Sequence, residues 1–218
     1  MMKAPKETTA RRTHMRESIK VIATELLIRH GLNGMSFRDI AQRLDTTTTN
    51  IHYHFGNKEK LVEEVTRDYV ANATARQRKI WLDPVSSLAE KLREVARYNY
   101  ERYSSFNPGN RGSHPWSLIG RLRLDAESLS PEAREALASF TLEVHAAVKV
   151  AVEVAYRKGE LIENAPTDDI AFLILNLVNS SSIFTQDAGS FDKLEQFYRV
   201  FSRVVLAAYS RPNSNLPI

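Results

Sequence analysis

The chain has 218 residues, a formal net charge of +4 and no cysteine, which excludes disulfides, thiolate nucleophiles and cysteine-based zinc sites. Hydrophobic residues make up 43% and charged residues 26%, as in ordinary soluble globular proteins. The longest apolar run, Ile170 to Val178, has nine residues and is interrupted by Asn176, whereas a membrane span needs about 20. The N-terminus lacks the apolar segment of a secretory signal, so we expect a cytoplasmic protein without a membrane partner.

The excess of positive over negative charge lies entirely in the first quarter of the chain. Residues 1–60 hold 11 Lys and Arg against 6 Asp and Glu, a net charge of +5, whereas residues 61–218 hold 19 against 20. A basic segment on a near-neutral body predicts a polyanionic partner at that segment. On charge alone, a basic tail that only improves solubility is the alternative.

The sequence predicts an all-α protein, since Gly and Pro number only 8 each and few turn-forming residues favour helices over many short strands. Residues 1–11 are polar and unpatterned, and we expect them to be disordered. From Thr13, apolar residues recur at helical spacing. This first helix ends at His30-Gly31, where the glycine is placed for a left-handed C-cap.

Two short helices are predicted next. Ser36, with Asp39 three residues later, resembles a capping box and opens a helix of about eight residues. Its apolar face follows the helical spacing Phe37, Ile40, Ala41, Leu44. Residues 45–47 form the turn, because Asp45 tolerates the left-handed region and Thr47 is a suitable N-cap. The next helix covers about residues 48–54, with Ile51 as its inward anchor.

Longer helices are predicted for the remainder. Gly56-Asn57 opens a helix that reaches about Trp81, and Pro84 then divides the chain into residues 1–83 and 84–218. Further helices are expected at about 88–103, 115–125, 131–157 and 167–186, and from Ser190 onward. Ser130-Pro131 and Thr167 serve as start signals. Residues 104–114 are a turn-rich loop, residues from Pro212 form a polar tail, and no repeat or strand pattern is found.

Two short helices joined by a tight turn, the second polar on its outer face, are typical of a helix-turn-helix. Ile51 would hold the second helix, leaving Thr48, Thr49, Asn50, His52 and Tyr53 to face the major groove or its phosphates. Threonine methyls suit the thymine methyl, and asparagine bonds adenine through two hydrogen bonds. Backbone amides at Ser36 and Asn57 would be available to phosphates. Two polar surface helices without a function are the alternative.

Residues 13–65 resemble the N-terminal domain of the TetR (tetracycline-repressor) family, without gaps. The resemblance rests on Phe37-Arg38-Asp39-Ile40-Ala41 and on the run from Ile51 to Leu61, Ile-His-Tyr-His-Phe-Gly-Asn-Lys-Glu-Lys-Leu. The family has an Ile-Ala pair in the first short helix, a Leu-Tyr-x-His/Tyr-Phe segment closing the recognition helix and Lys-Glu/Asp-x-Leu opening the fourth. Asp45 replaces the common turn glycine, and His52 stands where the family usually has tyrosine, commonly a phosphate contact. The remaining 150 or so residues match only in helical character.

The resemblance implies a homodimeric transcriptional regulator, usually a repressor, that binds a palindromic double-stranded DNA operator and is released by a small-molecule effector. Residues 1–83 would be the DNA-binding domain with the connecting fourth helix, and residues 84–218 the ligand-binding and dimerisation domain. Base and backbone contacts are implied for Thr47, Thr48, Thr49, Asn50 and Tyr53. Arg38, His54 and Lys58 would contact mainly phosphates. For Lys58 a solvated helix start is the alternative, and for His54 a packing role behind Phe55.

The resemblance places the dimer interface on the last two helices. Residues 170–178 support it independently, because a helix that is apolar on nearly all sides must be covered on all sides. A central helix of a monomeric bundle is the alternative.

Polar or aromatic residues on otherwise apolar helices are candidates for the effector pocket. They are Tyr98, Tyr103, Trp116, Phe140, His145, Asn176 and Asn179. For each one, a satisfied core or interface residue is the alternative. Such a mixture of polar and aromatic residues would suit an apolar or aromatic effector that carries one or two polar groups.

Other function classes find less support. The usual catalytic and nucleotide-binding motifs are absent, so we expect no enzyme, no catalytic residue and no cofactor. His52 and His54 lie about 200° apart on a helix, so we expect no metal site. A ligand-independent architectural or interaction protein that binds DNA is the remaining alternative. Salt-dependent, sequence-specific DNA binding would favour the transcriptional regulator over this alternative and over an enzyme.

Overall fold

The computed structural model describes residues 5–211, with side chains from residue 12 onward except that of Asn110. Within this range the chain is helical and contains no β-strand, only two isolated bridges. The α-helices are α1 (Pro5–His30), α2 (Phe37–Arg43), α3 (Thr48–Phe55), α4 (Lys58–Trp81), α5 (Leu88–Phe106), α6 (Leu118–Leu124), α7 (Pro131–Arg157), α8 (Thr167–Ala188), α9 (Asp192–Phe201) and α10 (Ala207–Tyr209).

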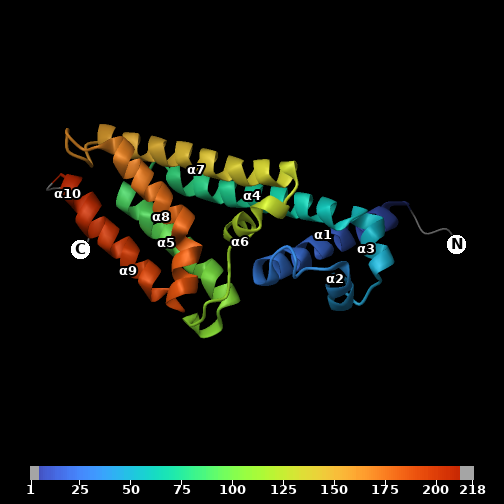
Figure 1. Cartoon of the computed structure of the whole chain (residues 1–218). Coiled ribbons are helices and arrows are strands. Elements are labelled where there is room, and N and C mark those ends of the chain that lie inside the picture. The colour runs from blue at the N-terminus through green and yellow to red at the C-terminus, as the bar shows by residue number, and fades with distance from the viewer. Residues whose placement is uncertain (1–4, 212–218) are drawn as a thin grey trace.

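The molecule is elongated, with α1–α3 at one end and α8–α10 at the other (Figure 1). The long helices α4 and α7 lie side by side and connect the two ends. The short helix α6 lies between α1 and the C-terminal helices and contacts α1, α4 and α8. The expected all-α fold, with an N-terminal helix-turn-helix and a C-terminal helical domain, is confirmed.

The local signals of the helix-turn-helix act as expected. Ser36 and Asp39 form a capping box, Thr47 caps α3, and Asn57 caps α4 through their side-chain oxygens. Asp45 has a φ of +47°, so an aspartate occupies the left-handed position of the turn. Ile51 and Phe55 are buried and fix α3 to the core of this end of the molecule.

Several predictions about helix starts were wrong. Residues 5–11 are helical rather than disordered, since Pro5 is suited to the first helical position and the helix continues directly into Thr13. The rest of the predicted disordered segment, residues 1–4, and the predicted polar tail, residues 212–218, lie outside the described part. The start of α8 at Thr167 was predicted correctly, but the capping role was not: Pro166 precedes the helix and no side chain caps it, while Asp168 pairs with Lys149 (2.9 Å).

The last helix begins at Asp192 rather than at Ser190. Ser190 bridges to Arg111, and Gly112 N donates to Gly189 O (2.8 Å), so this backbone is held against the loop after α5. The predicted loop lies about three residues further along the chain than expected, because α5 continues to Phe106 and α6 begins at Leu118 rather than at about residue 115. Asn107 then fastens it, donating to His114 O (3.1 Å) and accepting from His114 N (3.0 Å).

Candidate DNA-binding surface and internal cavity

Helix α3 presents a polar face to solvent. Of the ten predicted DNA-binding residues, seven are exposed: Ser36, Arg38, Thr47, Thr48, Thr49, His52 and Tyr53. The other three, Asn50, His54 and Lys58, are half-buried. This arrangement leaves the outer face of α3 open to a partner while its two apolar anchors point inward.

Several predicted contact groups are already held by neighbours. Thr47 Oγ1 accepts from Asn50 N (3.1 Å), and Asn50 Nδ2 donates to Thr46 Oγ1 (2.9 Å). The amide of Ser36, expected to be free for a phosphate, donates to the Asp39 carboxylate (3.2 Å). The hydrogen bond from Ser36 also lowers the pKa of Asp39, which keeps a negative charge at the start of α2. A phosphate at this position would therefore compete with Asp39.

The two histidines of α3 differ in their surroundings. His52 Nδ1 lies 2.7 Å from Gly56 O, and its ring meets Phe37 edge-on at 4.7 Å, so the imidazole closes the end of α3. His54 Nδ1 is buried without a hydrogen-bond partner among the described residues. Burial, and then the charges of Arg12 and Arg16, lower the pKa of His54. A neutral imidazole offers a phosphate a hydrogen bond but no charge.

Replacing His54 should flatten the pH dependence of stability. Because the pKa of His54 is lowered in the folded state, the unfolded chain binds its proton more readily, and folding loses stability as pH falls below about 6.5. We expect His54→Gln to lose less melting temperature than the native chain between pH 7.5 and pH 5.5 in thermal unfolding. An equal loss in both proteins would contradict this assignment.

Two arginines of α1 support α3 and were missed by the sequence analysis. Arg16 lies over the Phe55 ring (4.2 Å to its centroid), donates to His54 O and pairs with Glu64 of α4. Arg12 is exposed and lies over the Tyr53 ring at 5.2 Å. In the sequence, only the excess of basic residues near the N-terminus pointed to these arginines. That excess could not show that Arg16 is paired with Glu64 whereas Arg12 is exposed.

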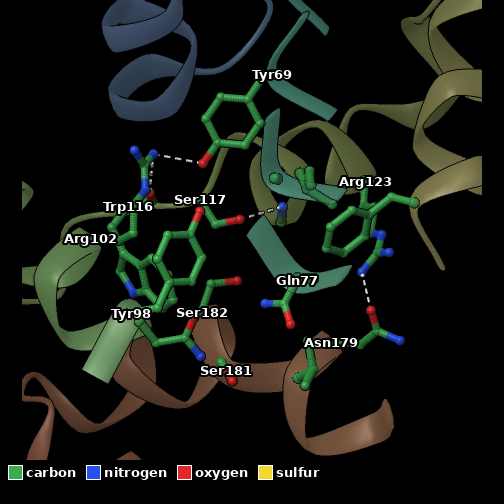
Figure 2. Close-up of a pocket in the computed structure, with 16 residues that line it drawn as sticks. Tyr69, Gln77, Tyr98, Arg102, Trp116, Ser117, Arg123, Asn179, Ser181 and Ser182 are labelled. Carbon is green, nitrogen blue, oxygen red and sulfur yellow. Dashed lines mark hydrogen bonds between the residues drawn. The ribbon is translucent and has the colours of Figure 1, made fainter. Parts of the chain in front are cut away.

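An internal cavity of about 50 Å³ lies among α4, α5, α6, α7 and α8 (Figure 2). Four of the seven predicted pocket residues line it: Tyr98, Trp116, Phe140 and Asn179. The sequence analysis missed several polar residues that line it as well: Tyr69, Gln77, Asn99, Arg102, Ser117, Arg123, Ser181 and Ser182.

The other three predicted pocket residues lie elsewhere. Tyr103 is buried but donates to Gly112 O (2.8 Å) and packs on Phe191, so it fastens the loop after α5. Asn176 is exposed, and its side chain donates to Phe172 O (2.8 Å) of its own helix. His145 is half-buried on α7 and is not among the residues that line the cavity. The helical spacing could not show which face of each helix met the cavity.

Helix α6 joins the cavity to α1. Gly120 and Arg123 line the cavity, whereas Asp125, directly after α6, accepts from Leu32 N (2.9 Å). Gly31 has a φ of +71°, and a Cβ there would lie 2.5 Å from Arg121 Nη2. Because residues 121 and 123 lie about 200° apart on a helix, the two arginines point to opposite sides. One packs against the end of α1 and the other faces the cavity.

Large apolar side chains are exposed on α8 and on the π-helical segment Ser202–Leu206 that follows α9. Phe172 and Ile183 are each 59% exposed and Val204 is 58% exposed. Leu173 and Phe184 are also exposed, and Phe184 packs on Phe197 of α9 (5.0 Å). The run 170–178 is therefore covered on one side only, by the core.

No cluster of three or more potential metal ligands occurs in residues 5–211. In the same range, no helix combines the length and the apolar character needed to cross a bilayer.

The comparison of sequences identifies the helix-turn-helix. The sequence model for "Bacterial regulatory proteins, tetR family" matches residues 21–65, from the middle of α1 into α4. The HTH-type transcriptional repressor KstR2 of Mycolicibacterium smegmatis is 30% identical over 95 residues, which make up 44% of this chain and 46% of KstR2. The chain spans about half the length of the curated relatives it matches.

Solved structures share the fold over most of the chain. A TetR-family transcriptional regulator from Agrobacterium tumefaciens has a TM-score of 0.77 at 19% identity, covering 92% of this chain and 100% of that protein. The ketosteroid transcriptional regulator KstR2 of Mycobacterium tuberculosis has a TM-score of 0.63 at 17% identity, covering 90% and 95%. Fold and surface define a helix-turn-helix protein with a second helical domain. The expected family is confirmed, and the N-terminal region belongs to the tetR family of bacterial regulatory proteins.

Proposed function

We propose that this chain is a cytoplasmic, non-enzymatic transcriptional repressor that binds a palindromic DNA operator as a dimer and is released by a small-molecule effector. The exposed polar face of α3, anchored by Ile51 and Phe55, carries the proposal. A helix held in this way can enter a major groove without unfolding its own support. The residues proposed to contact DNA are Ser36, Arg38, Thr47, Thr48, Thr49, Asn50, His52, Tyr53, His54 and Lys58, and we add Arg12.

The dimer is proposed to form through α8 and α9. Phe172, Asn176, Ser180 and Ile183 recur at spacings of three and four residues, so they form one stripe along α8. An exposed stripe with two large apolar side chains favours a self-complementary partner surface. Two-fold symmetry in the dimer would match a two-fold symmetric operator.

The effector is proposed to act through α6. In the structure the cavity is too small for most organic ligands, so a ligand would have to widen it by moving a wall. Helix α6 is the wall that also contacts α1, through Arg121 and Asp125. A ligand that binds the widened state better than the closed one would shift the dimer toward it, and DNA that selects the closed state would be released.

The proposal can be tested by selection from a random duplex DNA pool with the full chain and no added ligand. We expect enrichment of a two-fold symmetric sequence at moderate salt. Binding without enrichment would instead support a ligand-independent architectural protein with a basic N-terminus. The selected operator then serves the experiments below.

Lys58 and Asn50 should affect DNA binding in different ways. We expect Lys58→Ala to weaken binding to all sequences alike and to reduce the slope of log affinity against log salt by about 1. Asn50→Ala should instead relax preference at one base position, costing about 1–3 kcal/mol there. Lys60→Ala is the matched control, because Lys60 is already paired with Glu63 (3.0 Å). A changed sequence preference in Lys58→Ala would refute the phosphate assignment.

A further inference from the structure

The charged side chains that line the internal cavity are all positive. Arg102 of α5 and Arg123 of α6 lie on opposite sides of it, with Tyr98, Ser117 and Gln77 between them (Figure 2). No Asp or Glu is among the residues that line the cavity. A cavity with this lining is electropositive.

Both arginines make hydrogen bonds to neutral groups. Arg123 donates to Thr141 Oγ1 (2.6 Å) and to Asn179 Oδ1 (3.3 Å). Arg102 donates to Tyr69 Oη (2.7 Å) and lies over the Tyr69 ring. Within the described residues, neither arginine forms an ion pair, whereas seven other arginines do: Arg16, Arg29, Arg43, Arg76, Arg78, Arg97 and Arg199.

No other group in the cavity supplies a negative charge. Tyr198 contacts two of the lining residues, accepting from Asn99 Nδ2 (2.9 Å) and lying 3.3 Å from Ser181 Oγ. Burial raises the pKa of Tyr198 to about 12, so its hydroxyl stays neutral. Burial alone lowers the pKa of Arg123, and no neighbouring charge offsets it. Removing a guanidinium from water costs free energy that neutral acceptors only partly return.

The rest of the lining is apolar and aromatic. Tyr98, Trp116 and Phe140 form much of the wall, with Ile119 and Val178 beside them. Trp116 is already satisfied, because its Nε1 donates to Thr185 Oγ1 (2.7 Å). The wall therefore favours an apolar body, and the positive charge favours an anionic group.

We propose that the cavity binds an organic carboxylate, with its carboxylate group on Arg123 and its apolar body against Tyr98, Trp116 and Phe140. The planar guanidinium suits two parallel hydrogen bonds to a carboxylate. Asn179, whose bond to Arg123 is long, gives way first. This inference rests on the proposed function, in that the cavity is the effector site.

The test compares acids with their uncharged amides of nearly equal shape. The probes are acetate, benzoate and cyclohexanecarboxylate, each against its primary amide, titrated into the full chain by calorimetry. We expect at least one acid to bind at least tenfold more tightly than its amide. Arg123→Gln should reduce that ratio to near one, and Arg123→Lys should keep part of it. Arg134→Gln, which removes an exposed arginine of α7 outside the cavity, should keep all of it.

The outcomes separate this inference from the proposed function. If no acid is preferred over its amide, or if the preference survives in Arg123→Gln with native circular dichroism, the carboxylate site is wrong. Operator selection can succeed in either case. If an acid is preferred through Arg123 but leaves operator affinity unchanged, the carboxylate site stands and effector-driven release is wrong.

Discussion

The double substitution Phe172→Glu and Ile183→Glu is expected to make the chain monomeric and to weaken operator binding by at least about 100-fold. Burying one such side chain stabilises an interface by about 1.5–3 kcal/mol, and two-fold symmetry counts each position twice. The substitutions also place four carboxylates in the interface, where they lack partners. A monomer then reads only one half of a two-fold symmetric site.

Sedimentation velocity measures the oligomeric state, and fluorescence polarisation with labelled operator measures affinity. Leu142→Glu is the matched control, since Leu142 is an apolar residue of α7 that is 70% exposed and lies outside the stripe on α8. The control should remain dimeric and bind DNA as the native chain does. A double variant that stays dimeric would place the interface on another surface.

Gly120→Val is expected to lower operator affinity by about 10- to 100-fold without any ligand, in the usual range of allosteric coupling. A Cβ at Gly120 would lie 2.4 Å from Ser182 Oγ and 3.4 Å from Ser182 Cβ, so α6 touches α8 at this point. The γ-methyl groups of valine reach further than Cβ, and rotation of the serine hydroxyl does not make room for them. The substitution should therefore push α6 from α8, as we propose for the effector.

Two companion variants test that explanation. Ser182→Gly removes the obstructing side chain and should restore affinity when combined with Gly120→Val, whereas Ser182→Gly alone should change affinity little. Asp125→Ala removes the hydrogen bond to Leu32 N, so it should weaken the effect of Gly120→Val on DNA. A loss of affinity in Gly120→Val that neither variant changes would indicate unfolding of α6 rather than movement.

Local signals predicted the helix-turn-helix closely. The caps at Ser36, Thr47 and Asn57, and the left-handed Asp45, act within one turn of the chain, so neighbouring residues are enough to specify them. Prediction was poorer where a distant contact replaced the local signal. Ser190 has the chemistry of a cap, but its backbone bridges to Arg111 and the helix begins later.

The cavity was predicted only in part. Tyr98, Trp116, Phe140 and Asn179 were expected and line it, whereas Asn176 has the same chemistry as Asn179 and is exposed. The two asparagines are three residues apart and therefore only about 60° apart around α8, so the boundary between its cavity-facing and exposed sides passes between them, and the sequence cannot locate that boundary without the neighbouring helices.

By itself, the sequence determined the all-α class, the order of the helices and the N-terminal helix-turn-helix, because periodicity, caps and charge act locally. Helical spacing alone places Arg121 and Arg123 on opposite sides of α6, and only the tertiary structure decided that Arg121 lies against Gly31 and Arg123 faces the cavity. The physical reason is that burial of a charged side chain depends on which helices pack around it, and these helices are brought together from all parts of the chain.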